Sequence, residues 1–95
     1  NVQVTRSNAS NPRIDAYYAY TVTTESELQK VLNKLKDYIK SNYGSPGRVS
    51  ISITARTKKE AEQFAAILIK VFADLGLYYI NVTWTGDTVT VEGYL

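Results

Sequence analysis

The 95-residue sequence is 44% hydrophobic and 21% charged, and its formal net charge at pH 7 is +2. These values are typical of one ordinary globular domain, so we expect a single domain over residues 1–95. The small net charge does not favour a nucleic-acid or membrane partner. The sequence also contains no Cys and no His, which excludes disulfides and removes the commonest general base and metal ligand.

The N-terminal part of the sequence predicts two strands joined by a hairpin loop. Val2 and Val4 indicate a short first strand, and the polar residues 7–13 (SNASNPR) are typical of a loop. Residues 14–22 then alternate with a period of two, which predicts a half-buried second strand. The apolar positions on one face of this strand are Ile14, Ala16, Tyr18, Tyr20 and Val22.

A first helix is predicted to begin at Thr24 and to end before Gly44. Thr24 and Glu27 have the spacing of a capping box, in which the hydroxyl accepts from a free backbone N–H and the carboxylate accepts from the N–H of the capping residue. Apolar residues then recur at helical spacing, at Leu28, Val31, Leu32, Leu35 and Ile39. Gly44, Pro46 and Gly47 end the helix.

Residues 48–55 alternate again and predict a third strand. Thr57 and Glu60 form a second capping box, which predicts the start of a second helix. Its apolar positions are Ala61, Phe64, Ala65, Leu68, Ile69, Phe72 and Leu75. Gly76 is suited to the left-handed conformation that often follows a helix.

The C-terminal residues predict a second hairpin. Residues 78–84 carry apolar side chains at every second position, and residues 88–91 repeat this pattern with Val89 and Val91. Thr85, Gly86 and Asp87 form the predicted tight turn. The fourth and fifth strands are therefore expected to pair antiparallel.

The predicted element order is ββαβαββ, which indicates an α+β fold. We expect a five-stranded antiparallel sheet with the strand order 2-1-3-5-4, because this order satisfies both hairpins and keeps the crossovers short. The two amphipathic helices would pack on one face of the sheet. The other face would carry mainly Ser, Thr and Asn side chains.

Several segments resemble the Top Seven family of de novo designed α/β proteins. The resemblance is carried by TVTTESELQKVLN (21–33), ISITARTKKEAE (51–62), FAAILIKVFA (64–73) and GDTVTVEG (86–93), which together cover roughly half of the chain. It implies the ββαβαββ fold, high stability and no natural biological function. The local consistency of caps, strand residues and turns is also what an idealised sequence shows.

The departures from this family are expected to gather at one end of the molecule. Residues 7–13 and 41–47 form longer loops than the resemblance implies, and both are predicted to lie at the same end as residues 75–77 and the C-terminus. We call this the loop end. The remaining departures surround Arg6, Tyr17, Ala19, Ser50, Leu77, Tyr78, Tyr79, Trp84 and Tyr94.

The residue types at the loop end indicate an engineered surface for binding a protein target. Tyr offers a large contact area with little rotamer entropy, and Arg can pair bidentately with carboxylates. An acidic partner surface, such as the cleft of an enzyme that the chain would inhibit, would complement the Arg side chains. The predicted partner-binding residues are Arg6, Asn11, Arg13, Tyr17, Asn42, Tyr43, Arg48, Tyr78, Tyr79 and Tyr94.

Two other interpretations remain open. The chain could be a de novo design or a loop-remodelling product with no binding function. Alternatively, Tyr17 and Tyr79 could stack nucleic-acid bases beside Arg48, although the basic balance is weak and no ribonucleoprotein motif is present. We therefore expect neither a nucleic-acid nor a membrane partner, and we expect a monomer, with the two edge strands as candidates for self-pairing.

The sequence predicts no enzymatic activity, cofactor or metal site. Its acidic residues are isolated near helix and strand ends, and no Ser has a His partner that could activate it. There is no apolar run of 18 residues and no N-terminal signal pattern, so we expect a soluble recombinant protein that is suited to cytoplasmic expression and has no natural localisation.

Overall fold

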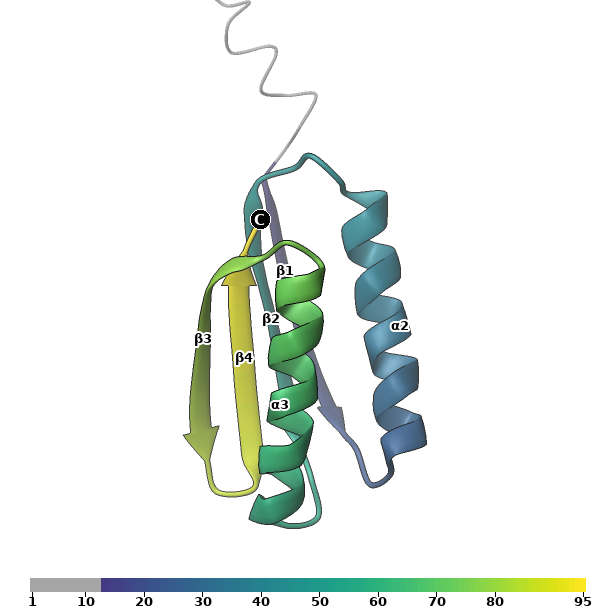
Figure 1. The fold of residues 1–95 in the computed structure, drawn as a ribbon, viewed down its shortest axis with the longest axis vertical. Helices are drawn as coiled ribbons and strands as arrows, with labels where there is room; N and C mark the ends of the chain where they lie inside the picture. The colour runs from purple at the N-terminus through teal and green to yellow at the C-terminus, as the bar shows by residue number, and fades with distance from the viewer. Residues whose placement is uncertain (1–12) are drawn as a thin grey trace, which may run out of the picture.

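The computed structural model describes residues 13–95, in which two helices lie on one face of a four-stranded sheet (Figure 1). The elements in chain order are β1 (Ile14–Thr21), α2 (Glu25–Ser41), β2 (Gly47–Thr54), α3 (Lys58–Asp74), β3 (Tyr78–Thr85) and β4 (Thr88–Tyr94).

The strand order is β1-β2-β4-β3, so the predicted five-stranded order 2-1-3-5-4 is wrong for this structure. β1 pairs directly with β2 and runs parallel to it over eight residue pairs, from Ile14 opposite Gly47 to Thr21 opposite Thr54. The sheet is therefore mixed and not wholly antiparallel. The predicted first strand, with Val2 and Val4, lies outside the described residues.

The error arose from the choice of strand neighbours. Periodicity identifies strands, but it carries no information about which strand lies beside which. The prediction relied on the tendency of sequential strands to pair, and it therefore inserted a hairpin strand between the second and third. In the structure, α2 returns the chain to the end where β1 began, so β1 and β2 run in the same direction and form one parallel ladder.

Both helices begin at the predicted threonine caps. The Thr24 hydroxyl accepts from the Glu27 N–H at 3.1 Å, and the Thr57 hydroxyl accepts from the Glu60 N–H at 3.1 Å. The second hydrogen bond of each predicted capping box, which the glutamate carboxylate accepts, differs from the prediction. The Glu27 carboxylate accepts from the Thr23 N–H at 3.0 Å, one residue before the cap.

The Glu60 carboxylate is held by Arg56 instead of by the backbone of its own cap. The guanidinium lies 2.8 Å from the Glu60 carboxylate oxygen, and this hydrogen-bonded pair lowers the pKa of the Glu60 carboxyl below its ordinary value. The carboxylate still lies in the first turn of α3, where a negative charge is favourable. At the other end of α3, Gly76 has the expected left-handed conformation, with φ of 86°.

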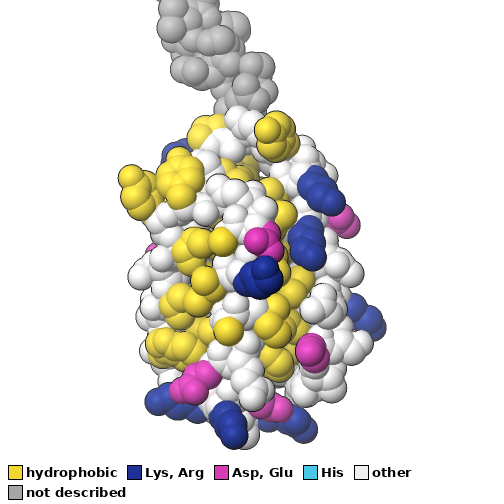
Figure 2. Space-filling model, in the orientation of Figure 1, with side chains coloured by type: hydrophobic (Ala, Val, Ile, Leu, Met, Phe, Trp, Pro, Cys, Tyr) yellow, Lys and Arg dark blue, Asp and Glu magenta, His cyan; other side chains and the backbone are white. Residues whose placement is uncertain are grey.

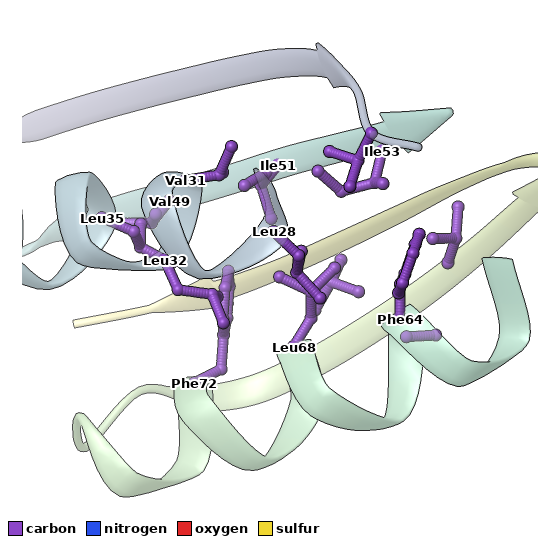
Figure 3. Packing of buried hydrophobic residues seen from close by; sticks show 14 of the residues in the cluster. Leu28, Val31, Leu32, Leu35, Val49, Ile51, Ile53, Phe64, Leu68 and Phe72 are labelled. Carbon is purple, nitrogen blue, oxygen red and sulfur yellow. The ribbon is translucent and has the colours of Figure 1, made fainter. Parts of the chain in front are cut away.

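The core lies between the helices and the inner face of the sheet. Figure 3 shows Leu32 of α2 and Phe72 of α3 directed toward each other, with Ile51 and Ile53 contributed by β2. All four of these side chains are fully buried. Among residues 13–95, no buried side-chain polar atom lacks a hydrogen-bond partner. The packed core gives the loop end a rigid support.

The open face of the sheet is polar where the two central strands meet. The hydroxyls of Ser52 and Thr90 lie 2.7 Å apart, and those of Thr54 and Thr88 lie 2.8 Å apart. Both pairs join β2 to β4 at directly opposite positions, which is the arrangement that stabilises neighbouring strands.

Candidate functional site

The loop end of the structure is formed by residues 41–47, residues 75–77 and Leu95. Figure 1 shows that the C-terminal ends of α2 and α3 and the end of β4 all lie there. Figure 2 shows hydrophobic side chains protruding at this end, close to the start of β3. Two adjoining hollows occupy this surface, and Pro46 and Leu95 line both of them.

The first hollow has a volume of about 320 Å³ and is surrounded by tyrosines. We call its lining the tyrosine patch, and its residues are Arg13, Pro46, Gly47, Tyr78, Tyr79, Tyr94 and Leu95. Four of the predicted partner-binding residues therefore come together here. Sequence reasoning missed Pro46, Gly47 and Leu95, although the loop that carries Pro46 and Gly47 was itself recognised.

The three tyrosine rings of the patch form a continuous aromatic row. The centroids of Tyr78 and Tyr79 are 5.1 Å apart with an interplanar angle of 67°, and those of Tyr79 and Tyr94 are 6.4 Å apart with an angle of 74°. Edge-to-face geometry of this kind is favourable between aromatic rings. Tyr78 and Tyr79 nevertheless remain 53% and 78% exposed, so the row presents apolar area to solvent.

Tyr79 holds its place in the row through an unusual backbone conformation. Its φ is 55°, which makes it the only non-glycine residue with positive φ among residues 13–95. The ladder between β3 and β4 shifts register between Tyr78 and Asn81, so Tyr79 lies in a β-bulge. A bulge of this kind redirects a side chain, and a left-handed tyrosine carries backbone strain.

The two described arginines of the predicted set have different surroundings. Arg13 is exposed and lines the patch, and it has no ion-pair partner among residues 13–95. Arg48 lies on the open face of β2, where its Nε is 3.1 Å from a carboxylate oxygen of Glu92 on β4. Its charge is therefore largely matched within the fold, and Arg13 is the better candidate for an acidic partner.

The second hollow has a volume of about 430 Å³ and lies between the ends of the two helices. Its lining residues are Ile39, Asn42, Tyr43, Gly44, Ser45, Pro46, Leu75, Gly76 and Leu95. Asn42 also has an intramolecular role, because its side-chain amide donates to the Tyr38 carbonyl oxygen at 2.8 Å and caps α2. Tyr43 is 90% exposed at the rim.

The remaining predicted residues lie elsewhere. Tyr17 is on the open face of β1, opposite Ser50 in the ladder, and it lines neither hollow. Arg6 and Asn11 fall outside the described residues. The structure thus brings together Arg13, Tyr78, Tyr79 and Tyr94, places Asn42 and Tyr43 beside them, and separates Tyr17 from the group.

Within residues 13–95 there is no group of three or more His, Cys, Asp or Glu side chains that could hold a metal ion. No helix of this described part is long and apolar enough to cross a bilayer.

Comparison with known proteins gives matches to designed structures. No protein-family model matches the sequence, and no curated protein is significantly similar to it. The de novo designed protein Top7NNSTYCC, solved by NMR in solution, is 74% identical, with 80% of this chain and 70% of that chain covered and a TM-score of 0.62.

Two further NMR structures of designed proteins also match, with lower TM-scores. A C-terminal fragment of the computationally designed protein Top7 is 85% identical over 48% of this chain and 81% of the fragment, with a TM-score of 0.45. The designed Top7-fold protein Top7m13 is 56% identical over 74% of this chain and 62% of that chain, with a TM-score of 0.43. All three matches are designed proteins, and none is described as an enzyme. The identity and coverage of the first match show that this chain belongs to the Top7 family of de novo designed proteins.

Proposed function

We propose that the tyrosine patch is an engineered surface that binds a protein target. The observation that carries this proposal is the row of Tyr78, Tyr79 and Tyr94, whose rings stack edge to face while two of them remain more than half exposed. Tyrosine is enriched at binding hot spots because a large, rigid ring loses little entropy on contact. A fold that had no use for this surface would gain nothing from holding Tyr79 in a strained conformation.

The partner that fits this surface carries an acidic group beside an apolar contact area. Arg13 lines the same hollow as the tyrosines and can form a bidentate pair with a carboxylate. The starts of β2 and β3 and the end of β4, which carry most of the patch, lie at the same end of the described part (Figure 1), and a target with a concave site, such as an enzyme cleft, would suit this surface. In that case the chain acts as an inhibitor that occludes the cleft, and it has no enzymatic activity of its own.

A second candidate function is that of a designed scaffold without a partner. The matches to designed Top7 proteins favour it directly, since designs can be made for their structure alone. Two of the predicted binding residues also have roles within the fold: Asn42 caps α2, and Arg48 pairs with Glu92. These residues need no partner to explain them.

The discriminating experiment is a binding screen of the full chain against an array of purified proteins. The double variant Tyr78→Ser/Tyr79→Ser serves as the negative probe, and Lys59→Ala, at the opposite end of the molecule, serves as the matched control. A target bound by the parent and by Lys59→Ala but lost with the double variant supports the proposal. Reversing the charge with Arg13→Glu should then weaken binding to that target, and added salt should weaken the parent complex.

An array on which the parent and the double variant bind the same set of proteins contradicts the binding function. The scaffold without a partner is then the better description. Circular dichroism of each variant confirms that loss of binding is not loss of folding.

A further inference from the structure

Residues 81–83 read Asn-Val-Thr, which is a sequon for N-linked glycosylation that the proposed binding function does not use. The pattern Asn-x-Ser/Thr marks an acceptor wherever x is not proline, and the attached sugar is bulky, so it needs a position on the surface. Such a short motif also arises by chance. Its ability to carry a sugar therefore depends on where the fold places its three side chains.

The sequon lies on β3 with its two functional side chains on the open face of the sheet. Asn81 and Thr83 are exposed, whereas Val82 between them is half-buried and packs against the core. Because side chains alternate along a strand, the Asn81 amide and the Thr83 hydroxyl share one face. The observed strand order and the order expected from the sequence both place β3 at an edge. A sugar on Asn81 therefore points away from the core and displaces none of its side chains.

The side-chain amide of Asn81 is available for modification. Its one hydrogen bond among residues 13–95 runs from Nδ2 to Glu92 Oε1, and at 3.5 Å this bond is long. The amide nitrogen carries two N–H groups, and attachment of a sugar replaces one of them. The other N–H can keep the contact with Glu92, so glycosylation removes no hydrogen bond that the fold requires.

The Tyr79 ring lies beside the position where the first sugar would be attached. The centroid of this ring is 6.4 Å from that of Tyr94, and Asn81 lies opposite Glu92. Glu92 and Tyr94 are alternate residues of β4 and share the open face. Alternate residues of a strand are about 7 Å apart, so the Tyr79 ring and the Asn81 amide are neighbours on this face.

The exposed ring of Tyr79 suits the apolar face of a sugar. Its side chain is 78% exposed, so one side of the ring is free to receive a partner. The first sugar of an N-linked glycan is N-acetylglucosamine, and one face of its pyranose ring carries only axial C–H groups. The faces of aromatic rings carry negative charge density, which attracts the weakly positive hydrogens of such groups. Stacking would also remove apolar area of Tyr79 from water.

We propose that Asn81 is an N-glycan acceptor whose first sugar packs on the Tyr79 ring when the chain passes through the secretory pathway of a eukaryotic cell. The donor is a lipid-linked oligosaccharide diphosphate. A bond forms between Asn81 Nδ2 and the anomeric carbon C1 of the sugar, as the bond from C1 to the diphosphate oxygen breaks. The lipid diphosphate leaves with the electron pair of that bond, and the amide loses one proton to solvent.

The first part of the test measures occupancy of the sequon. The full chain is secreted behind a cleavable signal sequence, and Asn8→Gln removes the other sequon, residues 8–10, which lies outside the described residues. Intact mass before and after treatment with a peptide-N-glycosidase should show one glycan, and peptide mapping should locate it at Asn81. Thr83→Ser keeps the sequon and should remain modified, whereas Thr83→Ala removes it and should not be modified.

The second part measures the contact with Tyr79 by a double-mutant cycle. An endoglycosidase trims the glycan to its first sugar, and denaturant unfolding compares this protein with the same sequence made without a glycan in bacteria. The sugar should raise the equilibrium constant for folding about five-fold, as a typical aromatic contact does. Tyr79→Ser should abolish this gain. Tyr17→Ser is the matched control that should retain it, because Tyr17 is an exposed tyrosine on the distant strand β1.

Circular dichroism establishes that each variant is folded before its stability is compared. Secretion of a folded chain with Asn81 unmodified overturns the proposal, as does modification that persists in Thr83→Ala. An equal gain from the sugar in the parent and in Tyr79→Ser overturns it as well, as does a gain that Tyr17→Ser also abolishes. These measurements involve no protein target, so their outcome is independent of the binding screen.

Discussion

The strain at Tyr79 leads to an unusual prediction, in which removing an aromatic side chain leaves the fold as stable as before or makes it more stable. Tyr79 has a φ of 55° in the β-bulge between β3 and β4. A left-handed conformation costs a residue with a Cβ about 1–2 kcal/mol, whereas glycine adopts it freely. Tyr79→Gly should therefore relieve this strain.

Two opposing contributions reduce the gain. Glycine makes the unfolded chain more flexible, which costs about 0.5–1 kcal/mol. The lost ring contacts with Tyr78 and Tyr94 count for little, because the Tyr79 side chain is 78% exposed. We therefore expect the free energy of unfolding of Tyr79→Gly to be unchanged or raised by up to about 1 kcal/mol.

The matched control is Tyr78→Gly, because Tyr78 is the adjacent tyrosine and does not have positive φ. Glycine there relieves no strain and replaces a residue that favours strands. We therefore expect the free energy of unfolding of Tyr78→Gly to fall by about 1–2 kcal/mol. Guanidinium unfolding followed by circular dichroism measures both values. If Tyr79→Gly destabilises the protein as much as Tyr78→Gly does, the conformation at Tyr79 is not strained and the reasoning fails.

Three further predictions concern the core, the sheet and the first helix. Phe72→Ala should lower the free energy of unfolding by about 3–5 kcal/mol, since Phe72 is fully buried, and denaturant titration checks this. Gly47→Ala should cost at least about 2 kcal/mol by the same assay, because an added Cβ would lie 2.1 Å from the backbone oxygen of Ile14, which cannot move without disturbing the ladder. The hydroxyl of Thr23 lowers the pKa of the Glu27 carboxyl, so the stabilisation by this carboxylate is complete above its ordinary pKa and is lost as the pH falls through the lowered pKa. Glu27→Gln should therefore show a smaller loss of stability across that acidic range, measured as the pH dependence of the urea midpoint, and an identical loss in parent and variant would contradict the role of Glu27.

Local signals in the sequence were sufficient for the helices and for their starting points. The spacing of Thr24 and Glu27, and of Thr57 and Glu60, located both helix starts, because a capping interaction joins residues that are three apart in the chain. The partners of the two glutamate carboxylates were not predictable from this spacing. Thr23 and Arg56 compete for the carboxylates, and a spacing rule does not rank such competitors.

The candidate binding surface was only partly accessible to sequence reasoning. Grouping residues by the end of the molecule correctly placed Tyr78, Tyr79, Tyr94 and Arg13 near one another. The same reasoning included Tyr17, which the structure places farther along β1 on the open face. It also treated Arg48 as available, since the partner of that side chain, Glu92, is 44 residues away in the sequence and meets it only through the pairing of β2 with β4.

The sequence by itself determined the elements that depend on neighbouring residues: the strand and helix periods, the threonine caps and the left-handed Gly76. The tertiary structure decided which strands became neighbours, and it gave the parallel β1–β2 ladder in place of the predicted order. It also decided the conformation of Tyr79, because a bulge sets two residues of one strand opposite one residue of its partner and therefore exists only once the two strands are paired. Periodicity records which face of an element is buried, but the surface that buries it is chosen by packing between distant segments.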